Sequence, residues 1–328
     1  MSVATVSRVL NDVGPVKEGT RRRVHEVAGK LRYVPNGAAR SLITRKTSTL
    51  GVLLPELYGE FFSEVIRGID QLARQSGYHL LVSSSHDDKS EVEAALRAMR
   101  GRVDGLLVMS PAIKEKSLVA NLPDSLPVVV LNSAIGSVFD SLTMDNFGGA
   151  RAMVRHLMKA GHKRVAIIKG PERNYDAAER LRGYRAALRS ARIDRDRRYE
   201  AEGDFTETSG FRATLALINR LPRPTAIFAA NDSMAIGALS ALHQAGVSVP
   251  REMAIAGFDD VPMAQYTNPP LSSVHVGLNE LGERATETLL RVVREKARHV
   301  RRHDVLGTTL VIRESCGGLY PDRELVQI

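Results

Sequence analysis

The chain has 328 residues, of which 43% are hydrophobic, and this length favours more than one domain. It contains no run of about eighteen apolar residues and no signal-peptide pattern, so we expect a soluble, cytoplasmic protein without a membrane partner. The single cysteine, Cys316, excludes an internal disulfide, and the nine histidines show no metal-ligand spacing. We therefore expect no metal site.

The positive charge is concentrated at the N-terminus. Residues 1–48 hold ten Lys or Arg against three Asp or Glu, which places +7 of the net charge of +9 in this segment. A basic head on a nearly neutral body is typical of a nucleic-acid-binding module joined to another domain. A disordered basic tail is the alternative, but the apolar residues between the charges recur with helical periodicity, which argues against it.

Two short helices are predicted in this head. The first spans residues 2–11, and Ser2 is its predicted N-cap. Its apolar face consists of Val3, Val6, and Val9 or Leu10. The second helix spans residues 18–32, with a predicted inner face of Val24, Val27, Ala28 and Leu31. The opposite face of the first helix combines small residues and hydroxyls suited to phosphates with one guanidinium that can reach a base edge: Ala4, Thr5, Ser7, Arg8 and Asn11.

Three motifs of the head occur in a recognisable order and spacing. They are Ser2-Val-Ala-Thr-Val-Ser-Arg-Val-Leu-Asn11, Val16-Lys-Glu-Gly-Thr-Arg-Arg-Arg-Val24 and Tyr33-Val-Pro-Asn-Gly-Ala-Ala-Arg-Ser-Leu42. Together they closely resemble the DNA-binding head of LacI/GalR-family transcription regulators. The resemblance implies a helix-turn-helix that reads bases in the major groove with Val3, Ala4 and Arg8. It implies phosphate contacts from Ser2, Thr5, Ser7 and Asn11, and we expect Arg22 to strengthen binding to any DNA sequence.

The same resemblance implies a hinge helix over residues 36–44, with Ala39 among its DNA contacts. Leu42 would be the apolar wedge that enters a central minor-groove step and kinks the operator. Taken alone, Leu42 could equally be a packing residue, and it is the surrounding Pro35-Asn36 and Ala39-Arg40-Ser41 that favour the wedge. Head and hinge together are expected to occupy residues 1–48.

The family's head contains a further helix of about ten residues, which precedes the first helix of this chain and packs behind it. Without that helix we expect a loosely folded head, because its apolar face lacks half of its cover. Met1 stands where the family usually has Val, and the Val codon GTG can serve as a bacterial start codon. We therefore expect the DNA upstream to encode the missing helix in the same frame.

Residues 49–328 alternate short apolar strands with amphipathic helices, and the alternation runs twice. This pattern predicts an α/β body of two doubly wound lobes, like that of periplasmic binding proteins, with parallel sheets covered by helices on both faces. Residues 273–276 and a helix over 278–295 are expected to return to the first lobe, and residues 306–312 to the second. Such crossings make a hinge, so a ligand would bind in the cleft between the lobes.

Polar residues follow three predicted strands, at the ends where doubly wound sheets bind ligands. They are Asp145-Asn146, Asn231-Asp232 and Asp259-Asp260. Their oxygens and amides suit a hydroxyl-rich ligand, although Asp and Asn after a strand also cap helices. The family resemblance extends over nearly all of the body. It implies polar effector contacts from Asp145, Arg180, Asn231 and Asp259, with Phe61 or Phe62 and Phe205 as apolar walls.

Two positions depart from the family pattern. Gly59-Glu60 stands where many members have Asn-Pro, and Val276 stands where sugar-responsive members commonly have Gln. Both departures change the polarity of the cleft around the effector, and one interpretation of Glu60 is a preference for a cationic or amino-bearing effector. Arg180 also has an alternative role, as the i,i+4 partner of Asp176 on a helix surface.

The resemblance implies a transcription regulator, most simply a repressor, that binds a palindromic operator as a homodimer in the cytoplasm, associated with the nucleoid. A small effector, a sugar or sugar derivative, would control it from the cleft. One alternative is a periplasmic-type sugar receptor, which the missing export signal and Arg21-Arg22-Arg23 disfavour; another is a ligand-binding protein with a non-functional DNA head. An enzyme is disfavoured because no dinucleotide, phosphate-loop or nucleophile-elbow motif occurs, and we expect no cofactor.

Overall fold

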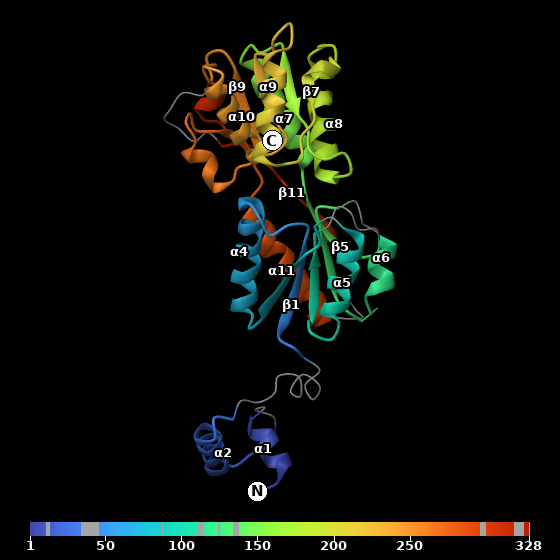
Figure 1. The fold of residues 1–328 in the computed structure, drawn as a ribbon. Helices are drawn as coiled ribbons and strands as arrows, with labels where there is room; N and C mark the ends of the chain where they lie inside the picture. Colours follow the sequence, from blue (N-terminus) through green and yellow to red (C-terminus); the bar gives the residue numbers. More distant parts are fainter. Residues whose placement is uncertain are drawn as a thin grey trace.

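A helical head and two α/β lobes make up the protein (Figure 1), as seen in a computed structural model. The structure describes residues 1–10, 14–33, 46–86, 88–109, 115–123, 125–133, 138–295, 300–317 and 325–327. The prediction of an α/β body behind a small all-α head is confirmed. In the described residues, no helix combines the length and apolar character needed to cross a bilayer.

The head contains α1 (Val3–Leu10) and α2 (Glu18–Lys30), which pack against each other. The backbone N–H of Thr5 donates to Oγ of Ser2 at 3.2 Å, so the predicted N-cap is confirmed. Val9 of α1 and Val24 of α2 are the buried residues of these two helices.

Three apolar side chains of the head were assigned to its inner faces, and the structure shows them exposed. Val3 is 87% exposed, Val27 is 47% exposed and Leu31 is 73% exposed. The physical reason is geometric, because α1 covers only the side of α2 that carries Val24. Exposure of Val3 agrees with a side chain available to a partner of α1 and not with a core position.

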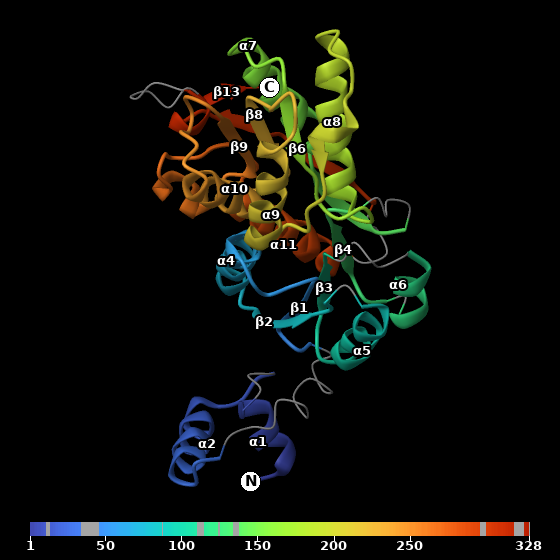
Figure 2. The same ribbon diagram turned by 45° about the horizontal axis from the view of Figure 1, so that its top comes forward.

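The first lobe holds a six-stranded parallel sheet in the order β11-β5-β4-β3-β1-β2. Its strands are β1 (Thr49–Leu54), β2 (His79–Ser84), β3 (Gly105–Val108), β4 (Val128–Leu131), β5 (Asp140–Met144) and β11 (His303–Leu306). Alternate residues face opposite sides, so Val52 joins one apolar core and Leu53 the other. The helices α4 (Glu60–Gln75) and α11 (Leu278–Glu295) cover one face, and α5 (Lys89–Met99) and α6 (Glu115–Asn121) cover the other (Figure 2).

The second lobe holds a seven-stranded sheet in the order β13-β12-β10-β9-β8-β6-β7. Its strands are β6 (Val165–Ile168), β7 (Glu200–Ala201), β8 (Ala226–Ala229), β9 (Ala254–Asp259), β10 (Ser272–His275), β12 (Thr309–Val311) and β13 (Leu325–Gln327), with β12 antiparallel to both of its neighbours. Its helices are α7 (Asn146–Lys159), α8 (Tyr175–Ser190), α9 (Glu207–Ile218) and α10 (Asp232–Gln244). The second lobe also contains three short 3₁₀ turns among the described residues, which are η1 (Arg197–Tyr199), η2 (Pro262–Tyr266) and η4 (Glu314–Cys316).

The chain passes between the lobes after β5, after β10 and after β11. The predicted return of α11 to the first lobe is confirmed. Of residues 306–312, which were predicted to return to the second lobe, β12 does so, but Leu306 ends β11 in the sheet of the first lobe. The prediction for residues 273–276 is wrong. These residues form β10 and the turn after it, and β10 pairs with β9 and β12 in the second sheet. Sequence order explains the error, because β10 follows β9 through the short turn η2 within one lobe, and only the next segment crosses.

Two glycines let α4 and α11 approach closely. A Cβ on Gly68 would lie 2.0 Å from the carbonyl oxygen of Asn279, and one on Gly282 would lie 2.2 Å from that of Val65. Both distances are shorter than any van der Waals contact, so only glycine fits at these two positions. This packing fixes the position of α4 against α11, and the first residues of α4 face the second lobe (Figure 1).

Candidate functional site

Arg180 of α8 is the centre of a buried polar network at the carboxyl ends of β8 and β9. Its side chain is almost fully buried. Nε donates to Oδ1 of Asn146 at 2.8 Å, and Nη1 donates to the carbonyl oxygen of Ala230 at 2.6 Å. Nη2 lies 3.1 Å from Oδ1 of Asp259, which forms a buried ion pair. The guanidinium has five N–H groups, so some donors remain for a ligand.

The network continues from Arg180 to Asp176 through Asn146. Nδ2 of Asn146 donates to Oδ1 of Asp176 at 2.8 Å, and all three side chains are buried. The alternative in which Arg180 and Asp176 form a pair on a helix surface is therefore wrong, because both side chains point into the protein. Asn146 is the residue that positions the guanidinium, and the sequence reading named it without giving it this role.

Aromatic rings flank the same guanidinium. Its central carbon lies 3.8 Å from the ring centroid of Phe258 and 5.9 Å from that of Phe205. Nδ2 of Asn231 donates to the carbonyl oxygen of Phe205 at 3.0 Å, and Oδ1 of Asn231 caps α10. The structure thus brings together four predicted residues: Arg180, Phe205, Asn231 and Asp259.

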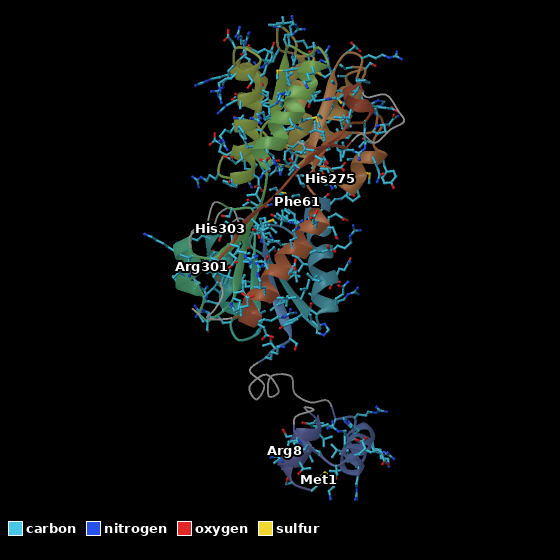
Figure 3. The ribbon with its side chains drawn as sticks, turned by 180° about the vertical axis from the view of Figure 1, so that it is seen from behind. Met1, Arg8, Phe61, His275, Arg301 and His303 are labelled. Carbon is cyan, nitrogen blue, oxygen red and sulfur yellow. The ribbon has the colours of Figure 1, made fainter. Side chains whose placement is uncertain are left out.

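The other predicted effector residues lie outside this network. Asp145 caps α7, because its Oδ1 accepts from the backbone N–H of Gly148 at 2.8 Å. Phe61 and Phe62 begin α4 in the first lobe, with ring centroids 5.1 Å apart and an edge-to-face geometry. Figure 3 shows Phe61 at the end of the first lobe that faces the second. Val276 is buried in the segment that crosses to the first lobe after β10.

Asn132 is a further candidate for the site, which the sequence did not single out. It directly follows β4, at the carboxyl end of the first sheet, in a left-handed conformation with φ of 48°. Its side chain is 5% exposed, and neither the nitrogen nor the oxygen of its amide has a hydrogen-bond partner among the described residues. Burying an unpaired amide is costly, so such a group usually awaits a ligand or water. The signal was present, since an Asn follows an apolar strand here as it does at Asn231.

Burial shifts the acids of the site toward protonation. It raises the pKa of Asp259 to about 7, although the adjacent Arg180 guanidinium acts in the opposite direction. It also raises the pKa of Asp176 to about 6. Burial and the charge of Asp259 raise the pKa of Asp232 well above its ordinary value. Near neutral pH the site can therefore exchange a proton when a ligand changes its hydrogen bonds.

Metal coordination finds no support in the part of the chain that the structure describes. No group of three or more His, Cys, Asp or Glu side chains is arranged there to hold an ion. The site provides directed hydrogen bonds from a guanidinium, carboxylates and amides, which lie beside aromatic rings. This combination suits a neutral molecule rich in hydroxyl groups.

The head presents most of its predicted DNA contacts on its surface. The side chains of Ser2, Val3, Ala4, Arg8 and Arg22 are exposed, and those of Thr5 and Ser7 are partly exposed. Arg8 is labelled on α1 in Figure 3. Asn11, Ala39 and Leu42, and with them the predicted hinge helix over 36–44, lie outside the described residues.

The fold and the site define a two-lobed ligand-binding body attached to a basic helical head. Comparison with known families agrees on both parts. Residues 154–316 match the periplasmic binding protein-like domain, and residues 1–36 match the bacterial regulatory proteins of the lacI family. The chain belongs to the lacI family of bacterial regulators, as its motifs predicted.

Individual relatives support this membership over almost the whole chain. A ribose operon repressor of Haemophilus influenzae is 33% identical over 317 residues, covering 96% of this chain and 95% of the relative. The lac repressor dimer bound to operator matches with a TM-score of 0.87 and 28% identity, over 96% of each chain. A lacI-family regulator from Enterococcus faecium with bound ribose matches with a TM-score of 0.74 and 26% identity, over 81% of this chain and 98% of that one.

Proposed function

We propose that this protein is a sequence-specific transcriptional repressor whose affinity for operator DNA is set by a small hydroxyl-rich effector bound between the lobes. The observation that carries the proposal is the buried Arg180 network on one lobe, with the unpartnered amide of Asn132 on the other. A ligand that pairs with both sides draws the lobes together, which is how two-lobed proteins clamp small molecules.

A sugar, and ribose in particular, is the effector that the chemistry supports best. Arg180, Asn132 and Asn231 can supply hydrogen-bond donors, and Asp259 can supply an acceptor. Phe205 offers an apolar face for the carbons of a sugar ring. Ribose is the first candidate because it is bound in the structure of the Enterococcus faecium regulator and because a ribose operon repressor is among the relatives. We infer a binding role without turnover, as expected for a chain whose relatives are repressors.

DNA binding is assigned to the exposed side of α1. Arg8 would read a base edge in the major groove, and Arg22 of α2 would neutralise phosphate. The lac repressor binds its operator as a dimer, and we propose the same assembly here, with two heads on a palindromic operator in the bacterial cytoplasm. Effector binding then shifts the population of lobe arrangements, and operator affinity changes by the coupling free energy.

Calorimetric titration tests the effector half of this proposal. The panel is ribose, a hexose, an amino sugar and a sugar phosphate, each titrated into the purified protein. We expect ribose or another neutral sugar to bind, and we expect the sugar phosphate to bind worst, since carboxylates surround the single arginine of the network. Binding of the sugar phosphate alone would contradict the proposed effector class, and hydrolysis or conversion of a bound sugar would contradict a purely regulatory role.

A further inference from the structure

A hydrogen bond joins the two lobes between the start of α4 and the turn η2. Oε2 of Glu60, the first residue of α4, accepts from the backbone N–H of Met263 in η2 at 2.9 Å. The two residues are 203 positions apart in the chain and belong to different lobes. Figures 1 and 2 both show the start of α4 directed toward the second lobe.

The bond satisfies a helix terminus that its own segment leaves open. The first N–H groups of a helix have no partner within it, and a side chain of the N-cap residue usually accepts from one of them. The N-cap residue of η2 is Val261, which makes no side-chain cap, and Pro262 has no N–H to donate. Met263 therefore presents the first free amide of the turn, and Glu60 caps it from the opposite lobe.

The position of the bond links the two walls of the site. Glu60 directly precedes Phe61, which begins the apolar wall of the first lobe. Met263 comes four residues after Asp259, which contacts Arg180 in the second lobe. A lobe movement that draws the start of α4 away from η2 breaks this bond, because each lobe carries one of the two residues.

We propose that Glu60 is a closure residue, which holds the cleft shut by capping η2 across the rim. The inference deepens the proposed function, since closure matters only if an effector is enclosed. It also gives the Gly59-Glu60 departure a role other than selecting a cationic effector, because one carboxylate oxygen already accepts from the opposite lobe. A proline at this position would offer no side-chain acceptor.

The effect on binding should be moderate and should appear mainly in the dissociation rate. Glu60 is half-buried and Met263 is 47% exposed, so water can replace part of the bond when it breaks. We expect Glu60→Ala to release ribose about three- to tenfold faster, as loss of one such hydrogen bond implies. Glu60→Gln should release it at nearly the wild-type rate, because an amide oxygen also accepts.

Interlobe distance in the absence of any ligand tests closure independently of the effector. Spin labels are placed on cysteines introduced at Gln75, at the exposed end of α4, and Gln244, at the exposed end of α10. We expect Glu60→Ala to shift the distance distribution toward longer values and Glu60→Gln to leave it near wild type. Glu56→Ala is the matched control, since Glu56 is an exposed acid in the loop that leads into α4.

An unchanged distance distribution in Glu60→Ala would overturn the proposal, as would an equal shift in Glu56→Ala. The effector assignment and the closure role of Glu60 are contradicted by different results. If ribose and the other sugars do not bind but the distances shift as expected, closure stands and the effector assignment fails. If ribose binds and leaves all four proteins at the same rate with the same distances, the effector assignment stands and the role of Glu60 fails.

Discussion

The guanidinium of Arg180 and the carboxylate of Asp259 form an ion pair at 3.1 Å, and both side chains are almost completely buried. Their elements, α8 and β9, meet only in the folded second lobe. Oδ1 of Asp259 lies close to Nη2, yet it makes no well-directed hydrogen bond in the described residues. The pair therefore keeps hydrogen-bonding capacity for a ligand while its charges compensate each other.

Removing the guanidinium should abolish effector binding and destabilise the second lobe. Arg180→Ala leaves Asp259 and Asn146 buried without their partner, and we expect it to lower the free energy of unfolding by about 3 kcal/mol. Chemical denaturation measures the stability and calorimetry measures the binding. Arg182→Ala is the control, because Arg182 lies on the same helix but is exposed and pairs with Glu179. A change within about 0.5 kcal/mol is expected there, and equal losses in both variants would refute the central role of Arg180.

Effector affinity should rise with pH through neutrality. In the proposed complex a sugar hydroxyl would donate to the ionised carboxylate of Asp259, and burial raises the pKa of this group to about 7. Below that pH the carboxyl is protonated and must lose a proton to accept the hydroxyl. Calorimetry at pH 6 and pH 8 should therefore show binding about tenfold weaker at pH 6, with proton release at the lower pH. Asp259→Asn should remove the pH dependence.

The same raised pKa has a consequence for stability. Its folded value of about 7 exceeds the ordinary value of 3.8, so the folded protein holds a proton that the unfolded chain releases. The contribution of this group is fully present below about pH 4 and is lost as the pH rises through 7. We expect the difference in unfolding free energy between wild type and Asp259→Asn to fall from pH 5 to pH 8. A difference that stays constant from pH 5 to pH 8 would show that Asp259 is ionised throughout.

Asn132→Ala should weaken effector binding without lowering the stability of the protein. Its amide is buried without a partner, so removing it should leave the free energy of unfolding unchanged within about 1 kcal/mol. Ribose binding should weaken by roughly tenfold, as loss of one or two ligand hydrogen bonds implies. Asn231→Ala is the comparison, because it removes the cap of α10 and should cost about 1 kcal/mol of stability. Destabilisation by Asn132→Ala with normal ribose binding would remove Asn132 from the site.

Part of the site could be predicted from the sequence because Asn231 and Asp259 lie at the ends of apolar strands. Arg180 and Asp259 were expected from the family motifs, and the structure brings them into contact. The role of Asn146 could not be predicted, because it depends on how α7 and α8 pack. Asn132 follows the same rule as Asn231 and was overlooked. The cross-lobe partner of Glu60 is 203 residues away, a contact that no local pattern encodes.

The fold was predictable where strands are apolar and buried, and less so elsewhere. The strand β11 begins with exposed His303 and Asp304, and so lacks the apolar run that marks a buried strand. The misplaced β10 (Ser272–His275) is a buried strand of mostly polar residues, and its sequence does not identify the sheet that it joins. In the head, Val27 and Leu31 show helical spacing, yet periodicity does not say whether a neighbour covers them.

Close packing of α4 on α11 should make Gly282 intolerant of substitution. A Cβ there would lie 2.2 Å from the carbonyl oxygen of Val65, so Gly282→Ala must push the helices apart. We expect a loss of about 1–3 kcal/mol in the free energy of unfolding, measured by urea denaturation. Gly307→Ala serves as the control, since a Cβ at Gly307 would meet no atom within 4 Å. If Gly282→Ala is as stable as Gly307→Ala, the helices are not held at this separation.

Fluorescence anisotropy of labelled DNA from the gene's own upstream region tests the central claim most directly. The titration is run with ribose absent and present, on the 328-residue chain and on the same chain extended upstream in frame. We expect tight, salt-sensitive binding by at least one form, and we expect ribose to change its affinity by about five- to 150-fold. Arg8→Ala should relax base preference, and Arg22→Ala should weaken binding to all sequences. The proposed regulatory function would be contradicted if both forms bound this DNA as weakly as unrelated DNA and if no sugar that binds the body changed this binding.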